Sequence, residues 1–181
     1  RTLRMQAEVE ADMLLNLSDL KNYADSLAKR VPSIAQRVKI NEPGVSADDL
    51  LKLSGTIGLP PVYARCIQAL SLFGVAIGYF SAWPGSIKAG SMVEALIHAN
   101  QEDYPGAQEA RNTGLLVVAQ EEANLVCVGR ADSRIPDAVF LLDVMRSSNV
   151  ERQSVAPDFE KFLLLAGNLH EIGHKYSRDA T

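Results

Sequence analysis

The chain has 181 residues, a length that fits one globular domain with an appended helical arm. Hydrophobic residues make up 47% of the sequence and charged residues 22%, which is typical of a folded protein and excludes an intrinsically disordered one. The formal net charge is −4, from 22 acidic and 18 basic residues, and this balance disfavours nucleic-acid binding, because phosphate contacts require clustered lysine and arginine. No nucleic acid is therefore expected among the partners.

The cysteines and the uncharged stretches predict a cytoplasmic protein. Cys66 and Cys127 are far apart and lack CxxC spacing, so we expect two reduced thiols and neither a disulfide scaffold nor a thiolate metal site. Residues 1–4 show no signal-peptide pattern. The uncharged segment 66–87 contains glycines and a proline, and it is too polar and too broken for a membrane span. A membrane is therefore not expected among the partners.

The first forty residues predict a helical arm. Apolar residues recur at alternating spacings of four and three and form one seam: Met13, Leu17, Leu20, Ala24, Leu27 and Val31. We expect the helix to end at Pro32 and its seam to pack on the body of the same chain. Pairing with a second copy, giving a homodimer through this helix, is the alternative. We divide the chain into this arm, residues 1–40, and a core, residues 41–181.

Two short helices are predicted after the arm. Ser46 and Asp49 form a capping box, and the helix that they open is expected to close at Gly58. The prolines at positions 60 and 61 favour the start of a second helix, which we expect to continue over residues 63–73.

The middle of the chain predicts a strand, a helix and a loop. The short apolar segment 75–80 is rich in strand-forming residues and predicts one buried strand. Ser91 and Glu94 form a second capping box, which opens a helix through about residue 99. The polar segment 100–112 contains a Pro-Gly pair and is typical of an exposed loop.

The last third of the chain predicts strands followed by a closing helix. Apolar segments 115–119 and 125–128 flank a short polar turn and predict a hairpin, and segment 138–144 predicts a further strand beside it. Pro157 fits the first position of a final helix, whose apolar stripe consists of Phe159, Phe162, Leu163 and Ala166. This order of elements predicts an α+β fold with a mainly antiparallel sheet packed against helices.

One chemical motif stands near the end of the sequence. His170, Glu171 and His174 match HExxH, which on a helix binds zinc through both histidines and uses the glutamate as general base. A catalytic zinc needs a third protein ligand, and Asp179 is the one candidate among the seven residues after His174. We therefore predict no metal, no cofactor and no catalytic residues, and keep a zinc metallopeptidase as the alternative.

Several landmarks between residues 45 and 169 resemble the SUKH superfamily in their order and spacing. Ile57-Gly58-Leu59-Pro60 followed by Tyr63 is similar to the opening of that family, and segment 115–128 is similar to its central hairpin. Residues 139–143 resemble its next strand, which often ends in an acid, and residues 155–163 resemble its closing helix. The superfamily includes fungal cell-wall synthesis regulators and bacterial immunity proteins that neutralise polymorphic toxins.

The resemblance implies a non-enzymatic protein that binds and neutralises a cognate protein toxin. If the toxin is a nuclease, acidic side chains would face its basic cleft and speed association. Candidate contacts are the acids of the predicted loops and turns: Glu102, Asp103, Glu109, Glu121 and Glu122. A regulatory scaffold that self-associates through the arm remains a further alternative.

Overall fold

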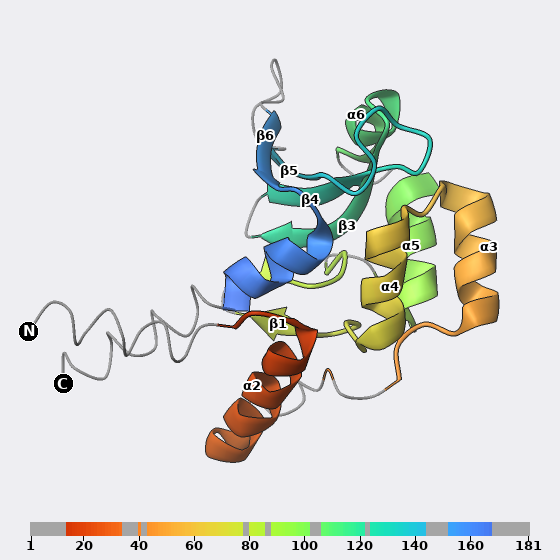
Figure 1. Cartoon of the computed structure of the whole chain (residues 1–181). Coiled ribbons are helices and arrows are strands. Elements are labelled where there is room, and N and C mark those ends of the chain that lie inside the picture. Colours follow the sequence, from red (N-terminus) through yellow and green to blue (C-terminus); the bar gives the residue numbers. More distant parts are fainter. Residues whose placement is uncertain are drawn as a thin grey trace, which may run out of the picture.

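The computed structural model has helices packed against an antiparallel sheet, which confirms the predicted α+β fold (Figure 1). It describes residues 14–33, 40, 43–77, 80–85, 88–101, 106–121, 124–143 and 152–167. The helices are α2 (Leu17–Arg30), α3 (Ala47–Ile57), α4 (Pro61–Ala69), α5 (Met92–Gln101) and α6 (Ala107–Asn112), and a last helix covers residues 159–167. None of the helices among these residues is long and apolar enough to cross a membrane.

The sheet is a six-stranded meander in which every neighbouring pair of strands is antiparallel. Its strands are β1 (Ala76–Ile77), β2 (Phe80–Ser81), β3 (Leu115–Glu121), β4 (Asn124–Gly129), β5 (Val139–Asp143) and β6 (Arg152–Ala156). The predicted hairpin of β3 and β4 is confirmed, and so is the position of β5 beside it. Strand β2 pairs with β3 only at Gln120 and Glu121, so the rest of that edge of β3 meets other elements.

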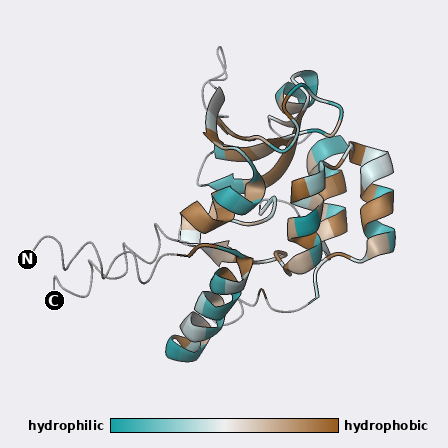
Figure 2. Ribbon diagram, in the orientation of Figure 1, coloured by the Kyte–Doolittle hydropathy of each residue, from teal (hydrophilic) through white to brown (hydrophobic). Residues whose placement is uncertain are grey.

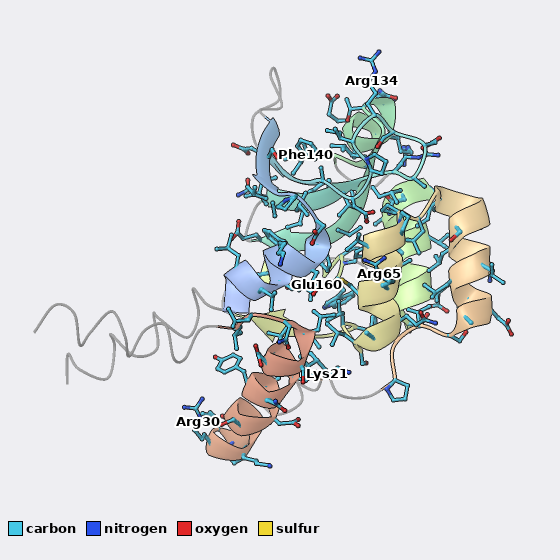
Figure 3. All side chains as sticks on the ribbon, viewed as in Figure 1. Lys21, Arg30, Arg65, Arg134, Phe140 and Glu160 are labelled. Atoms are coloured by element: carbon cyan, nitrogen blue, oxygen red, sulfur yellow. The ribbon has the colours of Figure 1, made fainter. Side chains whose placement is uncertain are left out.

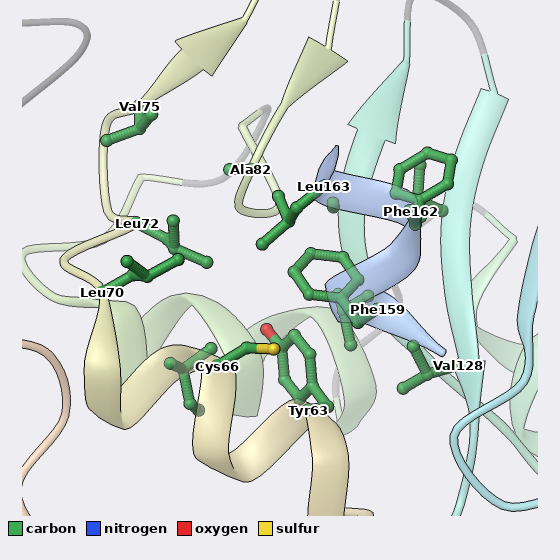
Figure 4. Close-up of a cluster of buried hydrophobic side chains, with 14 of the residues drawn as sticks. Tyr63, Cys66, Leu70, Leu72, Val75, Ala82, Val128, Phe159, Phe162 and Leu163 are labelled. Carbon is green, nitrogen blue, oxygen red and sulfur yellow. The ribbon is translucent and has the colours of Figure 1, made fainter. Parts of the chain in front are cut away.

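Helices cover both faces of the sheet, because alternate residues of β3 and β4 are apolar on each side. The larger core cluster joins Leu116 and Val128 of the sheet to α3, α4, α5 and the last helix (Figure 4). A smaller cluster places Val117 against Ala107 and Ala110 of α6 on the opposite face. Figure 2 shows the resulting contrast between the hydrophobic central strands and the largely hydrophilic α2.

Helix α2 packs on the body of the same chain. Leu20 and Ala24 are buried within the larger core cluster. A Cβ atom added at Gly167 of the last helix would lie 2.7 Å from Cδ1 of Leu14 and 3.1 Å from Cδ1 of Leu20, so α2 and the last helix are in close contact. The described residues of the apolar seam therefore pack against the body of the same chain. Met13 and the side chain of Leu27 lie outside the described residues.

The serine N-cap of each predicted capping box is confirmed. The Oγ of Ser46 accepts a hydrogen bond of 3.2 Å from the N–H of Asp49, and Gly58 closes α3 in the left-handed region with φ 72°. Ser91 caps the next predicted helix: its Oγ accepts from the N–H of Glu94 at 3.2 Å, while Glu94 Oε2 accepts from the N–H of Gly90 at 2.7 Å.

Two predictions for the middle of the chain are wrong in detail. The helix expected over residues 63–73 ends at Ala69, because Leu70 is already extended with φ −128°. The segment 75–80 forms no single strand: β1 and β2 are two-residue strands that pair with each other, Ile77 opposite Phe80. Because the two strands are so short, the sequence over residues 75–80 is one apolar run, and its hydrophobic pattern does not distinguish one strand from two.

The polar segment 100–112 is not an exposed loop in its described part. Helix α5 continues to Gln101, and α6 forms because Ala107 and Ala110, three positions apart, are fully buried against the sheet. Strand β6 was not predicted, because its sequence begins with the polar run Arg152-Gln153-Ser154 and lacks apolar alternation. It joins the sheet by pairing with β5. The last helix starts at Phe159, and Asp158 Oδ1 caps it by accepting from the N–H of Lys161 at 2.9 Å.

Candidate protein-binding surface

The acids predicted as partner contacts do not form a cluster in the described residues. Glu102, Asp103 and Glu122 lie outside those residues. Glu109 is exposed, but on helix α6 and not in a loop, while Glu121 is the half-buried last residue of β3. The two described acids therefore lie on different elements, one on a helix and one at the end of a strand.

The predicted zinc motif is not placed by the structure. His170, Glu171 and His174 lie outside the described residues, as does Asp179. Over the part of the chain that is described, no group of three or more histidine, cysteine, aspartate or glutamate side chains could hold a metal ion.

The loop between β4 and β5, residues 130–138, is fastened to the rest of the fold by its backbone. The N–H of Arg130 donates to the carbonyl of Gly114 at 3.0 Å, and the N–H of Ala131 donates to the carbonyl of Gly58 at 3.1 Å. At the base of the loop Gly129 and Asp137 are joined by a 3.0 Å hydrogen bond from the N–H of Asp137. The β4–β5 loop is thus held at both ends, and the N–H of Ser133 donates to the carbonyl of Arg130 at 3.0 Å within it, which favours a single conformation.

Gly129 makes this conformation possible, because a side chain there would collide with the loop. An added Cβ would overlap the carbonyl oxygen of Ile135 and would lie 2.9 Å from its carbonyl carbon. We expect Gly129→Ala to lower the free energy of unfolding by about 2 kcal/mol, since backbone has to move. Gly55→Ala is the matched control: no atom lies within 4 Å of the added Cβ in α3, so a gain of about 1 kcal/mol is expected. Urea denaturation of both variants tests this, and equal effects would contradict it.

The fastened loop exposes an apolar and a basic side chain side by side. Ile135 is 52% exposed, and Arg134 extends away from the body of the protein beyond α6 (Figure 3). Sequence reasoning missed both, because Ser-Arg-Ile-Pro has the composition of an ordinary turn, and the start of the loop, Arg130 and Ala131, is held by the distant carbonyls of Gly114 and Gly58.

A polar pocket of about 510 Å³ opens beside the β4–β5 loop. It is lined by Thr56 and Ile57 of α3, Asn100 and Gln101 of α5, Arg111 of α6, Leu116 of β3, and Arg130. Nη1 of Arg111 donates to the carbonyl oxygen of Asn100 at 3.1 Å, and Nε of Arg130 lies 3.1 Å from Oδ1 of Asp132. Arg111 and Arg130, which come from different elements, therefore both line one concavity.

The buried pair Tyr63 and Cys66 is part of the core and not a reactive centre. Tyr63 is fully buried and packs edge-to-face on Phe159, with ring centroids 4.9 Å apart (Figure 4). Burial raises the pKa of Cys66 to about 12, with the negative charges of Glu160 and Asp158 adding to the effect. Because a thiol with this pKa stays protonated at neutral pH, Cys66 is a poor nucleophile and a poor metal ligand.

Comparison with known proteins does not identify a family for this chain. No protein-family model and no curated protein matches the sequence. The resemblance to the SUKH superfamily therefore stays a prediction.

Proposed function

We propose that this chain is a non-catalytic immunity protein that binds and neutralises a protein toxin in the cytoplasm, and that it docks through the β4–β5 loop. The observation that carries the proposal is the pairing of exposed Ile135 and Arg134 on a loop whose backbone is fixed by Gly58 and Gly114. Arginine and large apolar side chains supply most of the energy of protein interfaces when a partner desolvates them. A loop that is already fixed loses little conformational entropy on binding.

The charge of the loop indicates which kind of toxin surface it fits. Residues 130–138 contain two arginines, Arg130 and Arg134, and two aspartates, Asp132 and Asp137, so the formal charge of the loop is zero. Asp137 is buried and Arg130 is paired with Asp132, so the exposed Arg134 is the charge that lies next to Ile135 in the sequence. A partner with an apolar hollow bordered by acidic side chains complements this surface, and opposite charges across the contact fix its orientation. An acidic surface that faces a basic cleft remains the alternative, since Glu102, Asp103 and Glu122 lie outside the described residues.

The test is protection of a cell from the toxin encoded beside this gene. Cells that express the toxin together with the wild-type chain are expected to grow, and the two purified proteins are expected to form a stable complex. We expect Ile135→Glu to weaken the complex at least about 30-fold, as loss of a hot spot does, and to abolish protection. Calorimetry measures the affinity, and circular dichroism verifies that the variant is folded.

Leu51→Glu is the matched control, because Leu51 of α3 is 74% exposed and lies outside the β4–β5 loop. It is expected to leave affinity and protection unchanged. Loss of protection with Leu51→Glu but not with Ile135→Glu would move the binding surface to α3. The absence of both complex and protection with the wild-type chain would refute the immunity function.

A further inference from the structure

We propose that a second pocket, at one end of helices α3, α4 and α5, receives a lysine side chain of a protein partner and that Asp49 binds its ammonium group. The three helices stand side by side (Figure 1). The pocket has a volume of about 390 Å³ and lies where α3 and α5 begin and α4 ends. Gly58, which holds the β4–β5 loop, is at the other end of α3. The inference therefore goes beyond the proposed function and does not depend on it.

Most of the pocket wall is apolar and belongs to the core. The apolar wall residues come from the segment before α3, from the end of α4 and the residues after it, and from the start of α5: Val45, Ile67, Leu70, Leu72, Phe73 and Met92. All of them are part of the larger core cluster or pack against it. A wall of this kind fits the methylene groups of a lysine, which buries its stem against apolar surface and keeps its charged end near water.

Gly44 forms part of the wall because it lets the segment before α3 lie directly on the end of α4. The N–H of Val45 donates to the carbonyl of Ile67 at 2.7 Å. A Cβ atom added at Gly44 would overlap the carbonyl oxygen of Ile67 and would lie 2.7 Å from those of Gln68 and Leu70. On this side the wall is backbone packed on backbone, so the shape of the pocket is fixed before a ligand arrives.

The charges at the pocket favour a cation. Asp49 lines the pocket, and its described lining includes no lysine, arginine or histidine. Oε2 of Glu94 accepts a 2.7 Å hydrogen bond from the N–H of Gly90, another wall residue, so a second carboxylate lies beside the pocket. The first turns of α3 and α5 each contribute about half a positive charge, and the last turn of α4 about half a negative one. The two full negative charges therefore outweigh the helix ends.

Asp49 is oriented and has one oxygen available. Its Oδ2 accepts a 2.9 Å hydrogen bond from the hydroxyl of Ser46, which also accepts from the N–H of Asp49. Over the described part of the chain, Oδ1 of Asp49 has no hydrogen-bond partner. A single oxygen suits the compact ammonium of a lysine, whereas the planar fork of an arginine binds both oxygens of a carboxylate. Lysine is therefore the basic side chain that the pocket fits.

The experiment measures the binding of capped pentapeptides by the whole chain in the absence of any toxin. The ε-methyl resonance of Met92, a wall residue, reports binding in NMR spectra recorded at constant ionic strength. The lysine peptide Ala-Ala-Lys-Ala-Ala is compared with peptides that carry norleucine, diaminopropionic acid or glutamate in place of the lysine. Norleucine lacks the charge, diaminopropionic acid lacks most of the apolar stem, and glutamate has the opposite charge. We expect saturable binding of the lysine peptide and at least about tenfold weaker binding of each of the others.

Asp49→Asn is expected to lower the affinity for the lysine peptide about tenfold, because a charge-assisted hydrogen bond is lost, and to leave that for the norleucine peptide unchanged. Asp48→Asn is the matched control. It removes the same charge from the same helical turn, but Asp48 is exposed and does not line the pocket. A change below about twofold is expected for this variant. Circular dichroism verifies that both variants are folded.

The absence of saturable binding of the lysine peptide by the wild-type chain would overturn the proposal. Equal losses in Asp49→Asn and Asp48→Asn would also overturn it, because general surface charge would then explain the attraction. Norleucine binding as tight as lysine binding would refute the ammonium as the bound group, and preference for the glutamate peptide would show that the helix ends outweigh the carboxylates.

Butylammonium chloride, titrated in the same way, separates a protein side chain from a free amine. Saturable binding of both butylammonium and the lysine peptide supports the proposal, whereas binding of butylammonium without the peptide would refute a protein side chain as the source. None of these measurements involves the toxin. Their outcome is therefore independent of the protection assay, and either result can fail without the other.

Discussion

Replacing Asn100 by alanine is expected to lower the free energy of unfolding by about 4 kcal/mol. Asn100 is the last-turn residue of α5 and is 4% exposed. Its Oδ1 accepts from the N–H of Val117 at 2.8 Å, and its Nδ2 donates to the carbonyl of Val117 at 2.8 Å and to that of Leu96 at 2.9 Å. Alanine leaves the buried N–H and carbonyl of Val117 without these partners, and each such group costs about 1–3 kcal/mol.

The side chain of Asn100 takes the place of a neighbouring strand. Strand β2 pairs with β3 only at Gln120 and Glu121, and the register of β3 against β4 shifts between Val117 and Ala119. At Val117 the outer edge of β3 would have an unpaired donor and acceptor, and a buried pair of this kind is rarely left unsatisfied. The amide supplies one donor and one acceptor in the same order as a strand backbone does.

The aspartate variant separates this explanation from a simple loss of packing. Asn100→Asp has nearly the same shape, but an oxygen replaces the Nδ2 that faces two carbonyl oxygens, and a buried charge is introduced. We expect it to be at least as destabilising as the alanine variant. Gln101→Ala is the control, since Gln101 is the exposed next residue of α5, and a change below about 0.5 kcal/mol is expected. Urea denaturation curves measure all three, and a near-neutral Asn100→Asp would contradict the strand-substitute role.

Local signals in the sequence were sufficient to predict the position of several helices and strands. Ser46, Gly58 and Ser91 each act on backbone groups within four residues, so the boundaries that they set could be predicted without a tertiary structure. The hairpin of β3 and β4 was equally accessible, because both strands are continuous apolar runs joined by a short polar turn.

Elements that depend on distant partners could not be predicted in this way. Asn100 was assigned to an exposed loop because its hydrogen-bond partner, Val117, is 17 residues away. Ala107 and Ala110, which pack α6 against the sheet, are too weakly apolar to predict a buried helix from the sequence alone. The arginines of the polar pocket come from α6 and from the β4–β5 loop, and no spacing in the sequence places Arg111 and Arg130 at one concavity. The surface acids were chosen by their charge and by their place in predicted loops and turns, and neither criterion gives their position in the folded chain.

Asp137 supplies the second large effect, through a helix cap that comes from another part of the chain. Helix α4 starts at Pro61, and its N-cap residue, Pro60, has no side-chain acceptor. The missing acceptor is Oδ1 of Asp137, which takes a 2.9 Å hydrogen bond from the N–H of Tyr63, 74 residues earlier. Asp137 is only 8% exposed and has φ 65°, in the left-handed region where aspartate and asparagine are tolerated better than most residues.

We expect Asp137→Ala to lower the free energy of unfolding by about 3 kcal/mol. Loss of an N-cap acceptor costs about 1–2 kcal/mol, and alanine at positive φ costs about 1–2 kcal/mol more. Asp137→Gly tolerates the positive φ but loses the cap, so a loss of about 2 kcal/mol is expected. Asp137→Asn retains a carbonyl acceptor and the tolerated φ, and is expected to lose less than about 1 kcal/mol. Urea denaturation gives the three values.

The order of the three variants decides between a cap and a general need for negative charge. If the carboxylate acts as a hydrogen-bond acceptor for α4, asparagine is the mildest change and alanine the most severe. Asp132→Ala is the control in the same loop, and a loss below about 1 kcal/mol is expected, because Asp132 is 71% exposed. An asparagine variant as unstable as the alanine variant would contradict the capping role. Because Asp137 lies two residues after Ile135, the same cap that starts α4 also anchors the end of the β4–β5 loop, and its loss is expected to weaken the proposed binding through Ile135 as well as the fold.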